Sequence, residues 1–245
     1  MKKILFTIYC TFFFASYTLA DTITEEREFI LYGKLPIFPR ISVLQISTTF
    51  SEINKSKYEL KFNIKTINLV NFLSNINGDG LVKGIIKENN YFPEFYKYDY
   101  VRGKKEKSVF LKYQNGKLVE EIISPMFDKN KLTPIREDQK NNSIDPATLF
   151  LRLLDINKTN KCNQDIKIYD GKRRYDVYFD EKIIEKQIIE CSASQSRIGG
   201  YKIDKIDPLT NADLVKIRYE DSLNNKFLGF YAIKGLIEIM IEEVN

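Results

Sequence analysis

Residues 95–123 read FYKYDYVRGKKEKSVFLKYQNGKLVEEII, and this stretch decides the fold class. Apolar and polar residues alternate through three runs, which is the period of half-buried β-strands. The runs are Phe95–Val101, Ser108–Tyr113 and Leu118–Ile123. Between the last two stands Asn115-Gly116, a pair that tolerates the positive φ of a tight hairpin turn. The stretch therefore predicts three consecutive antiparallel strands.

The same alternation continues on both sides of this stretch. Residues 67–77 carry apolar residues at helical spacing, and they predict either a short helix or an irregular crossing. Residues 124–144 hold two prolines, many charges and little periodicity, and they predict a long loop. Further strands are predicted at Val43–Phe50, Tyr58–Ile64, Leu81–Lys87, Lys186–Glu190, Arg197–Ile206, Asp213–Tyr219, Lys226–Ile233 and Leu236–Glu242.

Residues 166–180 predict a second hairpin with its turn at Asp170-Gly171. Asp-Gly suits a two-residue primed turn, in which Gly171 has a positive φ. In that register Ile168 opposes Arg173, so Arg173 points to the apolar face of the sheet. An arginine there needs an acceptor such as an aspartate or a carbonyl at the C-terminus of a helix, and we favour a structural Arg–Asp pair over a ligand contact. The face is expected to carry Arg173, Tyr175, Val177 and Phe179.

Asp145 and Pro146 mark the start of one helix. Aspartate is a good N-cap, and proline fits the first helical position, where no backbone N–H is needed. The helix is expected to end near Asp155 and to pack across a sheet. Many strands with one short helix predict a mainly β fold, a curved antiparallel sheet forming a half-open barrel or a sandwich with the helix packed against it. The apolar helix face is expected to consist of Leu149, Phe150, Leu153 and Leu154.

The first twenty residues have the features of a cleavable export signal. Lys2 and Lys3 precede an apolar run over Ile4–Phe14, and small residues end at Ala20, with Asp21 opening the mature chain. The run is shorter than the ~20 residues that a membrane span needs. We therefore expect a signal peptide over residues 1–20 and a single, soluble β-rich domain over residues 21–245.

Charge and composition exclude several classes of function. Removal of residues 1–20 from the 245-residue chain leaves 225 residues and lowers the formal charge from +5 to +3. This small excess is spread along the sequence, so we do not expect nucleic acid as a partner. The chain has no histidine, which removes the commonest general base and the commonest metal ligand. We expect no cofactor and no metal.

Two cysteines, Cys162 and Cys191, remain after removal of the signal peptide. Two thiols in an oxidising compartment predict one disulfide. The loop that it closes has about 30 residues, and a loop of that length contributes roughly 3–4 kcal/mol in the chain-entropy treatment. A thiol nucleophile is the alternative, but there is no histidine to activate either sulfur.

Three segments carry a resemblance to a known family. They are Asp145–Leu149, Cys162 followed by Ile168–Asp176, and Cys191 followed by Gly199-Gly200-Tyr201. With Gly80–Gly84 and Pro93, the chain resembles the exported bacterial family of domain of unknown function 3108, in particular members from alphaproteobacteria. The resemblance implies a periplasmic location and a barrel-like β fold, and it implies no activity. It singles out as motif residues Asp145, Pro146, Asp170, Gly171, Arg173, Arg174, Tyr175 and Asp176. The chain departs from the family pattern at Phe227–Tyr231, where a proline is expected.

Catalytic motifs are weak in this sequence. Ser192, Ser194 and Ser196 form a cluster without the surroundings of a serine nucleophile. Asp128-Lys129-Asn130 lacks the glycine and the distal glutamate of a calcium loop. Carboxylate pairs of the kind that glycosidases use are more simply explained as solvated strand ends. These carboxylates are Asp170, Asp176, Asp180, Asp204 and Asp207.

Tyrosines alternate along one predicted strand beside a basic turn. Such a combination can bind nucleic acid or an acidic headgroup, but a tyrosine-rich strand face with a solvated hairpin tip is the favoured interpretation. The residues concerned are Tyr96, Tyr98, Tyr100, Arg102, Lys104, Lys105 and Lys107.

Two functional hypotheses remain. The first is a non-enzymatic envelope protein that binds an apolar ligand such as a lipid, or docks another envelope component. The second is a hydrolase or transferase that acts on envelope glycan through carboxylates. An open apolar groove under the helix of residues 146–154 would favour the first hypothesis, and close, buried carboxylates with raised pKa values in a cleft would favour the second. We prefer the first.

Overall fold

The computed structural model describes residues 22–68, 75–154, 162, 164–185, 187–203, 214–220 and 226–244. The predicted cleavage site at Ala20 and Asp21 lies outside these ranges, as do Asp204 and Asp207. The strand bounds are β1 Thr22–Lys34, β2 Ile41–Ile53, β3 Lys57–Thr66, β4 Ile76–Lys87, β5 Asn90–Arg102, β6 Lys105–Gln114, β7 Lys117–Ser124, β8 Gln164–Tyr169, β9 Arg174–Glu185, β10 Ile188–Gly199, β11 Leu214–Glu220, β12 Phe227–Lys234 and β13 Ile237–Val244.

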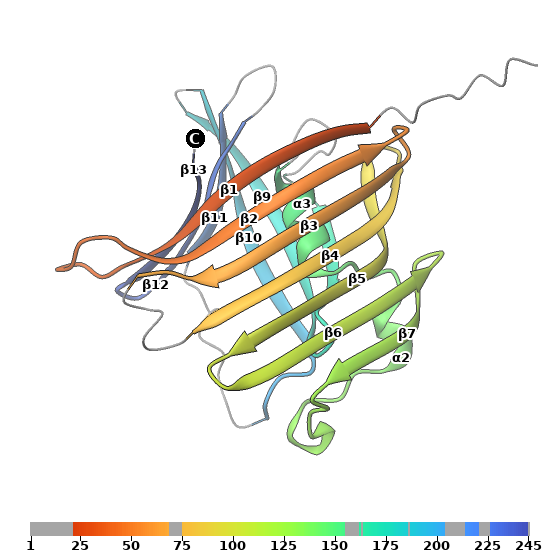
Figure 1. The fold of residues 1–245 in the computed structure, drawn as a ribbon. Coiled ribbons are helices and arrows are strands. Elements are labelled where there is room, and N and C mark those ends of the chain that lie inside the picture. Colours follow the sequence, from red (N-terminus) through yellow and green to blue (C-terminus); the bar gives the residue numbers. More distant parts are fainter. Residues whose placement is uncertain are drawn as a thin grey trace, which may run out of the picture.

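Within the described residues, thirteen strands form one sheet in the order β7-β6-β5-β4-β3-β2-β1-β13-β12-β11-β10-β9-β8. Each neighbouring pair is antiparallel, including β1 with β13. The sheet curls so that β1–β7 form one wall and the later strands form the opposite wall, with helix α3 (Pro146–Leu154) between them (Figure 1). The prediction of a mainly β, curved antiparallel sheet with a helix packed against it is confirmed.

The centre of the sheet was not predicted. No strand is predicted from the sequence at residues 22–34, yet β1 joins β2 to β13 and connects the two halves of the sheet. Its first half, Thr22–Arg27, carries three charges in six residues and lacks a clean apolar alternation. Its place comes from pairing with partners far away in sequence, which a local pattern cannot reveal.

The Asn115-Gly116 hairpin is confirmed, with β6 and β7 paired on either side of it and Gly116 at φ 75°. The second hairpin is confirmed too, but its register differs from the prediction. Tyr169 pairs with Arg174 and Ile168 with Tyr175, so the loop holds four residues, 170–173. The Asp170 carboxylate accepts the backbone N–H groups of Lys172 and Arg173, at 2.9 and 2.5 Å, which widens the turn.

Arg173 consequently lies in the turn and not on strand β9. Gly171 has the predicted positive φ, 87°. Tyr175, Val177 and Phe179 do share the inward face, where they pack with the core.

Some element boundaries were wrong. Residues 186–190 and 197–206 were predicted as two strands, but β10 runs unbroken through the serine-rich stretch between them. The strand forms there because β9 pairs along its whole length, so hydrogen bonds replace the missing apolar alternation. Residues 67–77 were predicted to be helical or irregular; Ile76 already belongs to β4, and residues 69–74 lie outside the described part. The predicted loop 124–144 also contains a 3-10 turn, Lys129–Lys131, and the short helix α2, Glu137–Lys140.

The two ends of the sheet, β7 and β8, do not pair with each other. The segment between them in sequence fills the gap: Ile144 forms a parallel bridge with Ile168 of β8, and the Asn142 N–H donates to the Gly116 carbonyl at 2.7 Å. We call residues 139–144, together with the strand ends that they join, the seam. Backbone hydrogen bonds from this irregular segment close the curved sheet. The barrel is half-open in this sense.

Helix α3 begins and ends where the sequence predicted. The Asp145 carboxylate accepts the Thr148 N–H at 2.8 Å, as an N-cap does. The predicted apolar face is incomplete, because the helix is enclosed by two walls. Leu149, Phe150 and Leu153 pack against the core of the later strands, together with Leu154, whereas Leu151 and Ala147 pack against the core of β3–β6.

Candidate functional site

An apolar cavity of about 300 Å³ lies on the inner face of the sheet beside the start of α3. We call it the inner pocket. Strands β2, β3, β5 and β6 supply its wall, α3 supplies one side, and the 170–173 turn supplies two charged groups. Its lining consists of Ile46, Thr48, Leu60, Phe62, Ile64, Tyr96, Tyr98, Tyr100, Val109, Pro146, Ala147, Phe150, Asp170 and Arg173.

Glycines of β4 shape the wall behind this pocket. A Cβ at Gly80 would stand 1.9 Å from the ring of Phe62, and one at Gly84 would stand 2.7 Å from the ring of Tyr58. The rings can lie flat against the sheet only because these positions lack a side chain. The space on the inner side of Phe62 therefore depends on Gly80.

The alternating tyrosines of β5 face inward and line the pocket. Tyr98 stacks on Tyr100, with ring centroids 4.8 Å apart, and lies 5.4 Å from the ring of Phe62. Burial raises the pKa of Tyr98 to about 12, so its hydroxyl stays protonated at neutral pH. On the opposite, outward face of β5, the Lys97 ammonium pairs with the Asp99 carboxylate at 2.8 Å. The interpretation as a tyrosine-rich face with a solvated tip agrees with this geometry, since residues 102–106 are exposed.

A buried carboxylate supports the α3 side of the pocket. Asp145 has no exposed surface, and its second oxygen accepts the Thr148 hydroxyl at 2.6 Å. Thr148 in turn shares a hydrogen bond of 3.2 Å with the hydroxyl of Tyr58. Burial raises the pKa of Asp145 from 3.8 to about 6, and the two hydrogen bonds from Thr148 oppose that shift. The group is committed to capping the helix that borders the pocket.

One ion pair stands at the edge of the pocket. Arg173 donates from Nε to Asp170 at 2.8 Å, and both residues line the cavity. The predicted Arg–Asp pair is confirmed, although the two residues meet within the turn and not across the strands. The Asp170 side chain is 13% exposed and that of Arg173 is 43% exposed, so the arginine is the group that reaches solvent.

The sequence matches the family described as "Protein of unknown function (DUF3108)" over residues 30–202, more than half of the chain. The chain belongs to this family. Comparison with curated proteins found no match. Among solved structures, a similar one is described as a β-barrel-like protein of domain of unknown function DUF1849 from Brucella abortus. That structure has 8% sequence identity and a TM-score of 0.47, and the comparison covers 90% of this chain and 95% of that one.

Two further motif residues of the DUF3108 resemblance, Arg174 and Asp176, lie at the seam. Arg174 is 3% exposed and donates from Nε to the Gln139 carbonyl of α2 at 2.7 Å. Its Nη1 donates to the Tyr175 carbonyl at 2.7 Å and to the Asp176 carboxylate at 2.5 Å. These contacts hold α2 to the start of β9. The segment Asp170–Asp176 therefore serves both places, with Arg173 at the pocket and Arg174 at the seam.

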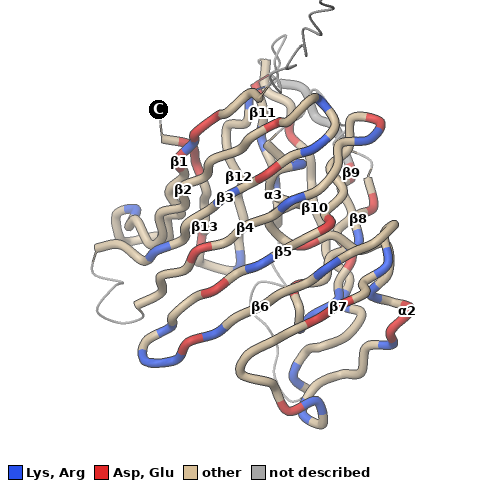
Figure 2. The backbone as a smooth tube through the Cα atoms, turned by 45° about the vertical axis from the view of Figure 1, so that its right-hand side comes forward, with Lys and Arg blue, Asp and Glu red and all other residues tan. Residues whose placement is uncertain are grey.

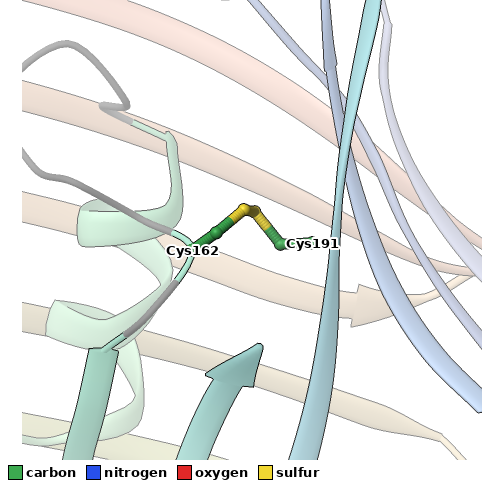
Figure 3. The surroundings of a disulfide bond; sticks show 2 residues. All are labelled: Cys162 and Cys191. Atoms are coloured by element: carbon green, nitrogen blue, oxygen red, sulfur yellow. A yellow bond between two sulfur atoms is a disulfide. The ribbon is translucent and has the colours of Figure 1, made fainter. Parts of the chain in front are cut away.

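The predicted disulfide between Cys162 and Cys191 is confirmed. The Cα atoms are 5.4 Å apart, and both side chains are buried in the core of the later strands. The bond ties the chain between α3 and β8 to strand β10 (Figure 3). It lies apart from the pocket lining, so its role here is structural.

The remaining candidates occupy places without a visible catalytic arrangement. Ser192, Ser194 and Ser196 alternate on β10 with Ala193, which packs inward, so the serines face away from the core. Asp128 caps the 3-10 turn by accepting the Asn130 N–H at 3.1 Å. In the described part of the chain, no three His, Cys, Asp or Glu residues are placed to hold a metal ion. Nor does any described helix have the length and apolar character to cross a membrane.

The helix and the tyrosine-rich strand are both predicted from the sequence, but the sequence does not show that they line the same pocket. Residues of β2 and β3, such as Thr48 and Phe62, line the same pocket, and they were recognised only as strand residues. A possible signal was the close spacing of Gly78, Gly80 and Gly84 in one strand, because glycine in a strand often marks a close approach. In the sequence, Gly80–Gly84 was interpreted only as part of the family resemblance.

Proposed function

We propose that this protein is an exported envelope protein that binds an apolar ligand, such as a lipid acyl chain, in the inner pocket without catalysing a reaction. The observation that carries the proposal is the position of the pocket. It lies beside α3, close to where an open apolar groove would favour a binding protein, and aliphatic and aromatic side chains make up most of its lining.

The size and lining of the pocket favour one narrow, apolar guest. Ligand pockets commonly span about 300–1,000 Å³, so a cavity of about 300 Å³ is at the lower end. Burial of apolar surface contributes about 25 cal/mol per Å², which is enough to hold an acyl chain reversibly once a few hundred Å² are covered. The partly exposed Arg173 is placed to lie near a polar end of such a guest.

The envelope location is part of the proposal. It rests on the charged start, the short apolar run and the small residues before Asp21. The disulfide agrees with an oxidising compartment, since such bonds are rare in the cytosol. Fractionation of cells expressing the full chain, followed by N-terminal sequencing, tests it. A mature protein that begins at Asp21 in the periplasm is the expected result.

A glycan-directed hydrolase is the second candidate, and the raised pKa of Asp145 is the one observation in its favour. A hydrolase of the usual kind needs two carboxylates facing a cleft. Asp145 has no exposed surface and caps α3, and Asp170 is bonded to Arg173 and to turn N–H groups. Both carboxylates have structural partners. An Asp170→Asn variant that abolished an activity on peptidoglycan would favour this candidate over the first.

Native mass spectrometry of protein extracted from the periplasm tests the binding proposal directly. The expected result is a co-purified species with the mass of a lipid or fatty acid, released when the protein is unfolded. The matched experiment blocks the pocket: Ile64→Trp fills it from β3, whereas Lys65→Trp places the same ring on the outer face. The first variant is expected to lose the bound species and the second to keep it. Equal retention by both would place the ligand elsewhere.

A further inference from the structure

Six apolar side chains stand exposed at one end of the sheet. They come from two hairpin turns, the one between β1 and β2 and the one between β12 and β13, which are adjacent because β1 pairs with β13. Ile37 is 87% exposed and Leu236 is 72% exposed. We call this set the apolar tip. It consists of Leu35, Ile37, Phe38, Ile41, Leu236 and Ile237.

The tip is an ordered, protruding feature. The Phe38 N–H donates to the Leu35 carbonyl at 3.1 Å, which closes the turn, and Pro36 and Pro39 restrict the backbone around it. The β1–β2 hairpin extends beyond the neighbouring strands in Figure 1, with the β12–β13 turn beside it. The apolar side chains are therefore presented outward on a convex surface.

Three cations flank the tip, namely Lys34, Arg40 and Lys234, and the two that border the β1–β2 turn are paired with carboxylates. Arg40 forms two hydrogen bonds to the Glu242 carboxylate, at 3.0 and 2.5 Å, and its guanidinium lies 3.4 Å from the ring centroid of Tyr32. Lys34 pairs with Glu238 at 3.1 Å. Residues 35–39 carry no charge. Entry of the β1–β2 turn into an apolar medium therefore buries no unpaired charge, which would be the main cost of such a transfer.

We propose that the apolar tip inserts into the interfacial region of a zwitterionic lipid bilayer. A protein partner needs about 1,000 Å² or more of matched surface, and a convex tip of six side chains offers less. A bilayer interface accepts apolar side chains without a complementary shape, and aromatic and aliphatic residues on a short element are what it binds. Because Arg40 and Lys34 are neutralised by Glu242 and Glu238, the attachment does not require anionic lipid.

The β1–β2 part of the tip and the strands that line the inner pocket belong to the same half of the sheet. Ile46, which lines the pocket, is five residues from Ile41 along β2, about 17 Å at the usual rise of a strand. Its partner across the strands is Ile64, another lining residue. Docking through the tip would bring the pocket close to the membrane surface. Insertion of the tip into a bilayer does not depend on what the pocket binds.

A tryptophan reporter tests the proposal, because the chain contains no tryptophan. Phe38→Trp places the only such ring in the tip, and Ile122→Trp places it at another exposed apolar position, on β7. With phosphatidylcholine–phosphatidylethanolamine vesicles, the emission of the first variant is expected to shift to the blue and to be quenched by brominated acyl chains. The emission of the second is expected to stay unchanged. Identical behaviour of the two reporters would overturn the proposal.

Vesicle flotation provides the second measurement. The Ile37→Ser, Leu236→Ser double variant is expected to lower the partition coefficient about tenfold or more, since two side chains no longer leave water. The control, Val119→Ser with Ile122→Ser, removes two other exposed apolar side chains, 52% and 56% exposed, from β7 and is expected to float like the wild type. Circular dichroism checks that both fold. Binding that appears only with anionic lipid, or that high salt abolishes, would contradict a neutral apolar attachment, and no binding at all would leave the tip to another partner.

Discussion

A single buried carboxylate links the local sequence to the pocket. Asp145 is an N-cap of the kind that sequence alone identifies, and its hydrogen bonds to Thr148 are the expected ones. What the sequence does not reveal is the environment. The hydroxyl of Tyr58 reaches Thr148 from β3, which lies far away in sequence, and the curled sheet removes the cap from water. Burial therefore changes the acidity of a group whose local role was predictable.

This environment has a consequence for stability as a function of pH. The pKa of Asp145 is raised from 3.8 to about 6 by burial, so the folded state holds its proton more tightly than the unfolded state does. The contribution to stability is present in full below pH 3.8 and is lost as the pH rises through about 6. The loss amounts to about 3 kcal/mol.

Asp145→Asn keeps an oxygen for the Thr148 N–H and removes the titration. The difference in unfolding free energy between this variant and the wild type is expected to shift in favour of the variant as the pH rises from 4 to 7. Urea denaturation at a series of pH values measures it. The difference cancels the background from other carboxylates, such as Glu59, whose pKa is lowered by Lys83 and Lys61. A difference that stays constant with pH would contradict the assignment.

Among the elements, strand β4 shows that apolar alternation in the sequence predicts only part of the strands behind the pocket. Local alternation predicted a strand over residues 81–87, and the structure begins it at Ile76. The missing part holds Gly78 and Gly80, which a propensity argument treats as turn residues. They are strand residues here because the rings of β3 and β5 cover them, as Phe62 covers Gly80. The turn residues could be recognised in the sequence, but the packing of aromatic rings over glycines within a strand could not.

A comparison of two glycines tests this packing. Gly80→Ala places a methyl group where Phe62 lies, at 1.9 Å, and the ring has to move toward the pocket. Gly33→Ala meets only Val43, at 3.5 Å, an ordinary contact in the same sheet. We expect Gly80→Ala to lower the unfolding free energy by about 1–3 kcal/mol and to weaken ligand binding. Gly33→Ala is expected to change neither by a measurable amount. Thermal denaturation and native mass spectrometry provide the two readouts, and equal effects would show that the ring adapts freely.

At the scale of the whole molecule, the described residues form one curled sheet whose ends are joined through the seam. The class of fold was predictable because most of the strands show apolar alternation and are bounded by turn residues, although β1 does not. Closure was not, because it depends on residues 139–144, which have no period and were predicted to be a loop. Figure 2 shows acidic and basic residues interspersed over the described chain, without a block of one sign, which agrees with the small charge excess noted in the sequence. A few charges are buried at the seam, among them Arg174 and Lys140.

Arg174 is the central charge of the seam, and its removal is expected to destabilise the fold there. It joins the Gln139 carbonyl to Asp176, and beside it Lys140, 7% exposed, bonds to Glu121 at 2.9 Å. Arg174→Met keeps much of the apolar stem but leaves the carbonyl and the carboxylate without their donor. Removal of one partner from a buried, hydrogen-bonded pair costs about 3–5 kcal/mol, with the lower end expected here because Asp176 can reach water.

Hydrogen–deuterium exchange locates the effect of that change. If Arg174 holds the seam, the amides that cross it should exchange faster in Arg174→Met, namely those of Asn142, Ile144 and Tyr169, whose acceptors are the carbonyls of Gly116, Lys167 and Ile144. Amides of β2 and β3, on the wall away from the seam, should keep their protection, because their ladders do not depend on it. Arg136→Met is the matched control, since its pair with Asp138 is exposed. Uniformly faster exchange in Arg174→Met would mean that the whole sheet is destabilised, and unchanged exchange at Ile144 would mean that backbone pairing alone closes the curve.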